Sequence, residues 1–238
     1  MLTVAMITLN EEKAIAKVID DIQAATRGVE AEILVVDSSS DRTPEIAAAK
    51  GARVVRQFPP QGYGRAMGRA LSESLGDVIV TLDCDDTYPA NRICELAESV
   101  ASGRCDLVNA SRLERKPSSM PLPNYVANRL FALTSRVLLG VKTTDVHSGM
   151  RAYRRSMLQT MDFDCSGPAL PVELLLKPAL LGYRVEEVFI PYLDRIGTTT
   201  LNRWSSTIWT FRRIFGLLPL RFSRRRSNLG PAALNRFG

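Results

Sequence analysis

Short apolar runs alternate with amphipathic segments along the first half of the chain. The run at residues 78–82 is apolar and largely β-branched, which is typical of a central strand that is covered on both faces. The alternation predicts strands at residues 2–8, 32–37, 52–57, 78–83 and 106–110, and helices at 11–25, 43–50, 65–75 and 91–102. Strands and helices that alternate at this spacing favour an α/β fold with a mostly parallel, doubly wound sheet flanked by helices.

The pattern changes after Arg112. A loop rich in Pro and Ser precedes a long apolar helix, and the remaining elements are predicted as a helix at 124–141, a strand-like segment at 145–155, a helix at 171–181 and a strand at 184–192. Residues 204–222 are apolar and aromatic with embedded arginines. We therefore expect one domain at residues 1–203 and a basic, amphipathic tail at 204–238.

Positive charge is concentrated at one end of the chain. The formal net charge of the 238 residues is +6, yet no Asp or Glu follows Asp194, whereas nine arginines do. Such a basic segment indicates contact with an anionic surface, either a membrane or a nucleic acid.

Neither the cysteines nor the apolar segments indicate a secreted or membrane-spanning protein. The four cysteines show no C-x-x-C spacing, so we expect no zinc site and a reduced, cytoplasmic environment. No signal-like region precedes the first predicted strand, and no run of about 18 apolar residues occurs. These features predict a cytoplasmic protein.

Three aspartates follow the apolar run at 78–82. Asp83, Asp85 and Asp86 are crowded at the end of a buried strand, where carboxylates repel one another and resist desolvation. A divalent cation shared with a phosphate-bearing ligand resolves that conflict, because hard oxygen ligands suit Mg²⁺ or Mn²⁺. The alternative is an acidic turn that caps the helix beginning near Asn91.

Asp37 ends the second predicted strand, one strand away from the aspartate cluster. Two acidic strand ends that face one crevice suit a nucleotide. Asp37 would bind the base or ribose, and the aspartate cluster would bind the metal and the diphosphate. Gly62, Gly64 and Gly68 open the following helix, where backbone N–H groups can approach an anion. Their spacing departs from the dinucleotide fingerprint, which argues against an oxidoreductase, and a flexible loop is the alternative.

Arginines follow two later segments. Arg151 comes after the only histidine, His147, and Arg195 comes after the last predicted strand. Arginine can bind a phosphate through two parallel hydrogen bonds, so both are candidate phosphate ligands. The alternative is solvated surface charge, and a lone histidine is more often structural than catalytic.

Together, the motifs resemble those of inverting family 2 glycosyltransferases with the GT-A fold, in particular dolichyl- and polyprenyl-phosphate mannosyltransferases and their glucosyl relatives. The resemblance covers about residues 1–205. It rests, in chain order, on Thr8-Leu9-Asn10-Glu11, Asp37, the glycine-rich turn, Asp83-x-Asp85, Ser111-Arg112, Ser148-Gly149-Met150-Arg151 and Arg195-x-Gly197.

The resemblance implies a role for each matching position. The nucleotide-sugar donor is expected to contact Thr8, Leu9, Asn10, Glu11, Asp37, Gly64, Arg65, Asp83, Cys84 and Asp85. Mg²⁺ or Mn²⁺ is expected on Asp83, Asp85 and Thr87, and the acceptor phosphate on Arg112, Ser148, Arg151, Arg195 and Thr200. The expected catalytic residues are Asp83, Asp85, Arg112, Arg151 and Arg195. Thr200 stands where the family usually has Lys, and Thr87 where mannosyl enzymes often have Gln, which leaves the sugar and the base open.

The implied reaction transfers a hexose, mannose or glucose, from GDP-mannose or a UDP-sugar to a polyprenyl or dolichyl phosphate at the cytoplasmic membrane face, with inversion. A phosphate monoester is already anionic near neutral pH, so it needs no strong general base. The resemblance also implies that the protein associates peripherally with the inner face of the membrane. The helices at 124–141 and 204–222 are expected to lie on the anionic membrane surface, with ordinary core helices as the alternative.

Two other functions remain to be weighed. A family 2 transferase acting on a hydroxyl acceptor in cell-envelope or polysaccharide synthesis would need a carboxylate base, for which Asp145 and Glu173 are the candidates. A nucleic-acid-binding protein would use the arginine-rich tail but would leave the aspartate cluster without a purpose. We therefore expect no nucleic-acid partner.

Overall fold

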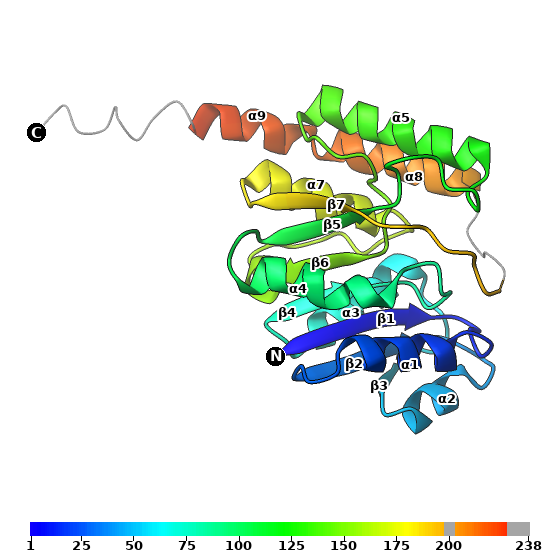
Figure 1. Cartoon of the computed structure of the whole chain (residues 1–238). Helices are drawn as coiled ribbons and strands as arrows, with labels where there is room; N and C mark the ends of the chain where they lie inside the picture. The colour runs from blue at the N-terminus through cyan, green and yellow to red at the C-terminus, as the bar shows by residue number, and fades with distance from the viewer. Residues whose placement is uncertain (198–202, 228–238) are drawn as a thin grey trace, which may run out of the picture.

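The computed structural model describes residues 1–197 and 203–227, in which seven strands form a single sheet (Figure 1). The strands are β1 (Leu2–Thr8), β2 (Ala31–Asp37), β3 (Arg53–Arg56), β4 (Val78–Thr81), β5 (Leu107–Ser111), β6 (Arg151–Arg154) and β7 (Val185–Phe189). The α-helices are α1 (Ile15–Ala25), α2 (Thr43–Ala49), α3 (Tyr63–Glu73), α4 (Ile93–Ala101), α5 (Leu122–Leu139), α6 (Arg155–Gln159), α7 (Leu170–Leu181), α8 (Arg203–Gly216) and α9 (Leu218–Ser227), with a 3₁₀ turn η1 (Ala90–Arg92) before α4.

The sheet is mostly parallel, as the sequence predicts. Its strand order is β3-β2-β1-β4-β6-β5-β7, and β6 alone among these strands runs antiparallel to both of its neighbours. The predicted strand at 145–155 is too long, because only Arg151–Arg154 pairs with other strands. The residues before it form a tight turn in which the Asp145 side chain accepts a hydrogen bond from the His147 backbone.

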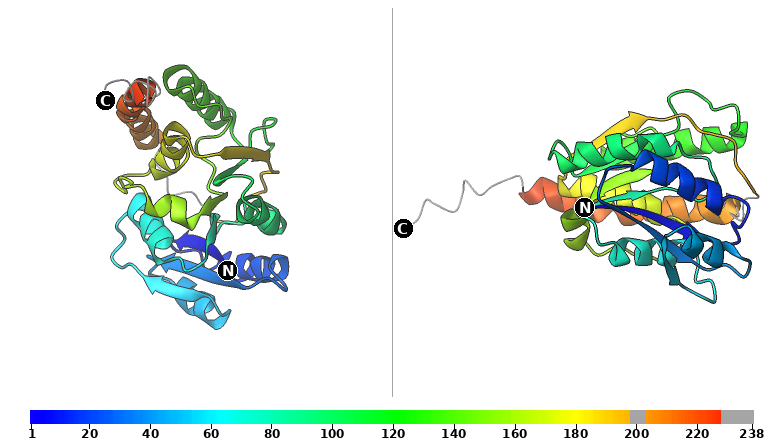
Figure 2. Two further views of the ribbon diagram at one scale, coloured as in Figure 1. Left: turned by 90° about the vertical axis from the view of Figure 1, so that its left-hand side faces the viewer. Right: turned by 60° about the horizontal axis from the view of Figure 1, so that its bottom comes forward.

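Helices cover both faces of the sheet, which explains why its strands are apolar on both sides. One core lies between the sheet and helices α1, α2 and α4, and the other lies between the sheet and helices α3, α5, α7 and α8. In Figure 1, α1 and α4 lie in front of the sheet, and Figure 2 shows the same layers from two further directions.

Three helical segments differ from the sequence prediction. Helix α1 begins at Ile15 and not at Glu11, and the residues before it form a turn whose Glu11 backbone N–H donates to the Thr43 hydroxyl of α2 at 2.9 Å. Helix α6 was not predicted. The apolar segment at 204–222 forms two helices, since Pro219 has no N–H to continue the hydrogen-bond ladder of α8.

Candidate active site at the carboxyl edge of the sheet

The strand order places a crevice between β1 and β4. On one side of β1 lie β2 and then β3, and on its other side β4 begins the second half of the sheet, so the order of the strands reverses between β1 and β4. Ligands of open α/β sheets bind at such a reversal, outside the carboxyl ends of the strands. The segment of Thr8 to Glu11 follows β1 here, and the segment of Asp83 to Asp85 follows β4.

Three carboxyl groups approach one another across this crevice. Burial and then the neighbouring negative charge of Asp85 raise the pKa of Asp83 to about 7. Glu11 behaves in the same way, since burial and then Asp85 bring its pKa to about 7. Within the described residues, no ion pair or hydrogen bond engages the Asp83 carboxylate. The charges of Arg112 and Arg195 act on Asp83 without contacting it and do not outweigh burial, so the carboxylate has no direct cationic partner in the described part of the chain.

Gly149 makes room for the Asp83 carboxylate. A Cβ atom at Gly149 would lie 2.7 and 2.8 Å from the two carboxylate oxygens of Asp83, which is closer than real Cβ contacts. The Gly149 N–H donates to the Tyr88 hydroxyl at 2.7 Å, and the Thr81 hydroxyl of β4 donates to the Gly149 carbonyl at 2.9 Å, so the turn is fixed against β4 and the loop that follows it. This contact explains the glycine of the Ser148-Gly149-Met150-Arg151 segment.

Asp85 is already paired with a cation. Its Oδ2 lies 2.5 Å from Arg195 Nη2, and its Oδ1 accepts hydrogen bonds from the Thr87 N–H at 3.1 Å and the Thr87 hydroxyl at 2.5 Å. Asp86 points elsewhere, because its backbone has φ of 64° and its carboxylate binds Lys17 at 2.8 Å. Two of the three clustered aspartates therefore face the crevice.

The atoms of the crevice that could ligate a metal fit Mg²⁺ or Mn²⁺. They are carboxylate oxygens, and within the described residues no cation forms an ion pair with the Asp83 carboxylate. No group of three His, Cys, Asp or Glu side chains within the described residues forms a complete metal cage. Magnesium is ordinarily held by one or two carboxylates together with substrate phosphates, which is the arrangement these residues allow. The role of Thr87 as a ligand stays a prediction, and in the structure Thr87 orients Asp85.

Asp37 lies deeper than the sequence suggested. It is fully buried, and its carboxylate accepts hydrogen bonds from the Thr8 hydroxyl at 2.7 Å, the Ser39 N–H at 3.2 Å and the Arg56 guanidinium. The Gln57 backbone N–H also binds the Asp37 carbonyl at 2.8 Å. The polar groups of Asp37 and Thr8 are thus already engaged by protein partners, and their contact with a nucleotide stays a prediction.

Sequence reasoning missed Gln57. Its side chain is 5% exposed, and neither atom of the carboxamide has a hydrogen-bond partner within the described residues. A single glutamine at the end of a short strand gives no signal in the sequence, because its burial depends on the loop that follows.

The other predicted donor residues divide into exposed and packed positions. Leu9, Asn10 and Arg65 are exposed beside the crevice, whereas the Cys84 side chain is 3% exposed and packs into the core. Its side chain is therefore turned away from solvent, and a contact between Cys84 and the donor stays a prediction. Gly64 has a packing role, since a Cβ there would overlap the carbonyl oxygens of Cys165 and Gly167.

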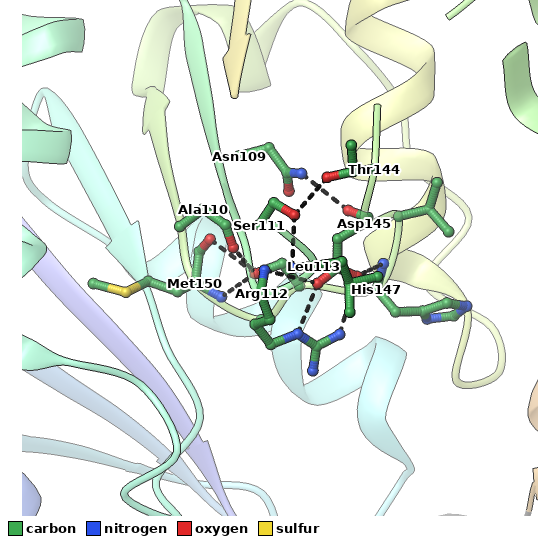
Figure 3. A network of polar contacts seen from close by, with 12 residues as sticks. Asn109, Ala110, Ser111, Arg112, Leu113, Thr144, Asp145, His147 and Met150 are labelled. Carbon is green, nitrogen blue, oxygen red and sulfur yellow. Dashed lines mark hydrogen bonds and ion pairs between the residues drawn. The ribbon is translucent and has the colours of Figure 1, made fainter. Parts of the chain in front are cut away.

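Arg112, a predicted ligand of the acceptor phosphate, is rigidly held in a network of polar contacts (Figure 3). Its Nε and Nη2 donate to the two Asp145 oxygens at 2.7 and 3.0 Å, and its guanidinium lies 5.9 and 5.2 Å from the ring centres of Tyr88 and Tyr192. Asp145 is fully buried, which would raise its pKa, but the Arg112 charge outweighs burial and lowers it. The Asp145 carboxylate therefore stays ionised.

Arg151 and Ser148 do not reach the crevice. Arg151 is 1% exposed, and its guanidinium donates to Asn109 Oδ1 at 2.8 Å and to the carbonyls of Val146 and Pro171. The Ser148 hydroxyl is buried and donates to the Ala110 carbonyl. Both side chains are thus engaged by protein groups in this structure, where Arg151 has a structural role, and their contacts with a phosphate stay predictions.

Arg195 stays accessible, and Thr200 lies outside the described residues. The Arg195 side chain is 32% exposed beside Asp85, so it faces both the acidic pair and solvent.

His147, for which the sequence favoured a structural role, forms a hydrogen bond with Thr210 of α8 at 2.8 Å, and burial lowers its pKa to about 4. The histidine is neutral at physiological pH and belongs to the packing between the turn and α8.

A mostly parallel sheet with an acidic pair at its reversal point is the arrangement expected of the GT-A fold. Glucosyl-3-phosphoglycerate synthase from Mycobacterium tuberculosis, solved with Mn²⁺, UDP-glucose and phosphoglyceric acid, superposes with a TM-score of 0.72 at 24% identity and covers 92% of this chain and 80% of its own. That likeness confirms the predicted fold.

Sequence comparison identifies the family. The chain matches "Glycosyl transferase family 2" over residues 3–161. A dolichyl-phosphate hexose transferase of Haloferax volcanii is 43% identical over 201 residues, which are 84% of this chain and 86% of the relative. An undecaprenyl-phosphate mannosyltransferase of Micrococcus luteus is 30% identical over 70% of this chain and 73% of its own length. The protein belongs to glycosyltransferase family 2 and is a glycosyltransferase.

No helix in the ranges 1–197 and 203–227 combines the length and the apolar character needed to cross a bilayer.

Proposed function

We propose that this enzyme transfers a hexose from a nucleotide-diphosphate sugar to a polyprenyl phosphate at the cytoplasmic membrane face, with inversion at the anomeric carbon. The observation that carries the proposal is the pairing of an acidic strand end, Asp83 and Asp85, with accessible or fixed arginines across one crevice. Two relatives are named for transfer to dolichyl or undecaprenyl phosphate, which agrees with an anionic lipid acceptor.

The donor is expected along β1 and β2. Leu9, Asn10 and Glu11 border the crevice, and the unpaired carboxamide of Gln57 lies in the chain segment bound to Asp37. Asp83 and Asp85 would hold Mg²⁺ or Mn²⁺, which supplies positive charge against the departing diphosphate.

The acceptor side favours a phosphate over a hydroxyl group. A hydroxyl acceptor needs a carboxylate base, but Asp145 is locked to Arg112 at 2.7 Å. Glu173 is equally committed, because Arg213 binds it at 2.8 Å and Lys177 at 3.2 Å. A phosphate acceptor carries its own negative charge, so Arg112 and Arg195 need only orient it and offset that charge.

An exposed apolar stripe on α5 supports action at a membrane. Five residues at helical spacing are each at least half exposed: Leu122, Val126, Leu130, Leu133 and Val137. Helices α8 and α9 lie beside α5 (Figure 1) and expose Trp204, Ile208, Phe215 and Phe222. None of these three helices contains an acidic residue. An apolar surface among arginines suits an anionic bilayer interface, where each basic residue contributes about 1 kcal/mol.

Membrane attachment can be tested by sedimentation with vesicles of phosphatidylglycerol and phosphatidylcholine. Leu133→Asp should weaken binding strongly, because it puts a negative charge in the middle of the stripe. Leu75→Asp is the matched control, since Leu75 is also 55% exposed but lies just before β4, outside these helices. Equal binding of both variants and the wild-type protein would remove the α5 stripe from the proposal.

The reaction itself can be tested with radiolabelled GDP-mannose, UDP-glucose and UDP-N-acetylglucosamine on a short polyprenyl phosphate. We expect a lipid-soluble product from one donor in the presence of Mn²⁺ and none after chelation. Replacing Asp83 and Asp85 with Asn should abolish transfer. Absence of product from all three donors would count against the proposal.

A further inference from the structure

Arg195 occupies a position that a metal would need. Its guanidinium lies 2.5 Å from Asp85 Oδ2, and the Asp85 side chain is 4% exposed while that of Arg195 is 32% exposed. Two backbone hydrogen bonds hold the segments together, from Ile196 N–H to the Asp85 carbonyl at 2.9 Å and from Leu193 N–H to the Thr87 carbonyl at 3.0 Å. The arginine is therefore presented to Asp85 by the backbone that carries it.

A guanidinium and a divalent cation compete for this carboxylate. A nearly buried carboxylate is unstable without a nearby positive charge, and Arg195 supplies that charge. Asp85 Oδ1 is taken by Thr87, so Oδ2 is the oxygen left for either cation. Two cations on one oxygen repel each other strongly, so one must leave when the other binds.

We propose that Arg195 is the resident counter-ion of Asp85 in the metal-free enzyme, and that binding of the metal with the donor displaces it toward the acceptor phosphate. The proposal rests on the function proposed above. The exchange sets the order of binding. The donor and metal bind first, and the released guanidinium of Arg195 then completes the phosphate site beside Arg112. The enzyme thereby holds its acceptor site incomplete until a donor is present.

The first test measures Mn²⁺ binding to the nucleotide-free protein by calorimetry. Arg195→Gln should lower the Kd for Mn²⁺ at least about tenfold, because the competing charge is gone. Arg195→Lys keeps the charge and should bind Mn²⁺ nearly as weakly as the wild type. Arg104→Gln is the control, since Arg104 pairs with Glu186 near the opposite edge of the sheet. Unchanged or weaker Mn²⁺ binding by Arg195→Gln would overturn the proposal.

The second test measures farnesyl phosphate binding with and without Mn²⁺ and a nucleoside diphosphate, UDP and GDP being tried separately. The wild-type protein should bind farnesyl phosphate at least about fivefold more tightly when Mn²⁺ and the matching nucleotide are present. Arg195→Gln should show no such gain, although it binds Mn²⁺. A gain of equal size in Arg195→Gln would overturn the proposal. If wild-type protein transfers hexose to polyprenyl phosphate but either result contradicts the exchange, the proposed function stands and only this inference fails.

Discussion

Replacing Gly149 with Ala should damage the acidic pair without unfolding the protein. The added Cβ would lie 2.7 Å from Asp83 Oδ2 and 2.9 Å from its Cγ. Ordinary contact between such atoms begins near 3.5 Å, so the carboxylate must move by roughly 0.5–1 Å. Asp83 lies two residues beyond β4, which is buried and paired with β1 and β6, so the strand before the aspartate cannot shift with it.

A displacement of this size has a calculable cost. Misplacing a catalytic group by about 1 Å can lower the rate by a factor of about 100, so we expect kcat/KM to fall about 10- to 100-fold. That loss corresponds to about 1.4–2.7 kcal/mol of transition-state stabilisation. Steady-state transfer at several Mn²⁺ concentrations should show a raised Mn²⁺ requirement together with the lower kcat/KM.

Gly216→Ala is the matched control for this substitution. A Cβ at Gly216 meets no atom within 4 Å, and Gly216 ends α8, remote from Asp83 in the sequence. It should leave transfer unchanged. If Gly149→Ala were folded and as active as the wild type, Asp83 would not have the role assigned to it.

Three further changes test other parts of the structure. His147 has a pKa of about 4 in the folded protein, whereas in the unfolded chain it takes up a proton below about pH 6.5. As the pH falls from 6.5 to 4, the free energy of unfolding of the wild type should therefore decrease by about 2 kcal/mol more than that of His147→Gln, measured by urea titration. Asp145→Asn leaves Arg112 with half of its buried ion pair and should lower the free energy of unfolding by about 3 kcal/mol, a cost that an unchanged urea midpoint would refute. Glu173→Gln should retain transfer to polyprenyl phosphate if the folded fraction is kept, because Glu173 pairs with Arg213 and acts as no base; a complete loss in folded protein would favour a hydroxyl acceptor.

The strands of the first half could be predicted because their sequence is consistent at every level. Apolar runs such as 78–82 are covered by helices on both faces, and the acidic residues after them appear where a parallel sheet places its ligands. Asp83 and Asp85 were therefore found from local sequence alone.

The antiparallel strand β6 and the fate of Arg151 could not be predicted in this way. The direction of a strand depends on which distant strands it joins, and Arg151 pairs with β4 and β5 in the sheet. Its guanidinium is buried among carbonyls of segments that are far apart in the sequence, which a motif cannot reveal. Residue type indicated a phosphate ligand, and the tertiary contacts show a structural arginine.

The predicted tail is the part that the structure describes least. Residues 228–238 and Thr200 lie outside the described ranges, and the boundary at residue 203 stays a prediction. Helix α8 packs on α7 and α5, with Arg213 bound to Glu173 of α7 and Ile214 in the core, while it exposes Trp204 and Ile208. Amphipathic periodicity predicted both features but could not divide the segment into α8 and α9.

The acceptor group is the centre of the account, and it can be tested by offering two acceptors that differ in one group. The wild-type enzyme, Mn²⁺ and the active radiolabelled donor are incubated with a short polyprenyl phosphate or with the polyprenol of the same length, and the lipid-linked hexose is counted. The account predicts product from the phosphate and none above background from the alcohol. Equal or greater transfer to the alcohol would contradict it.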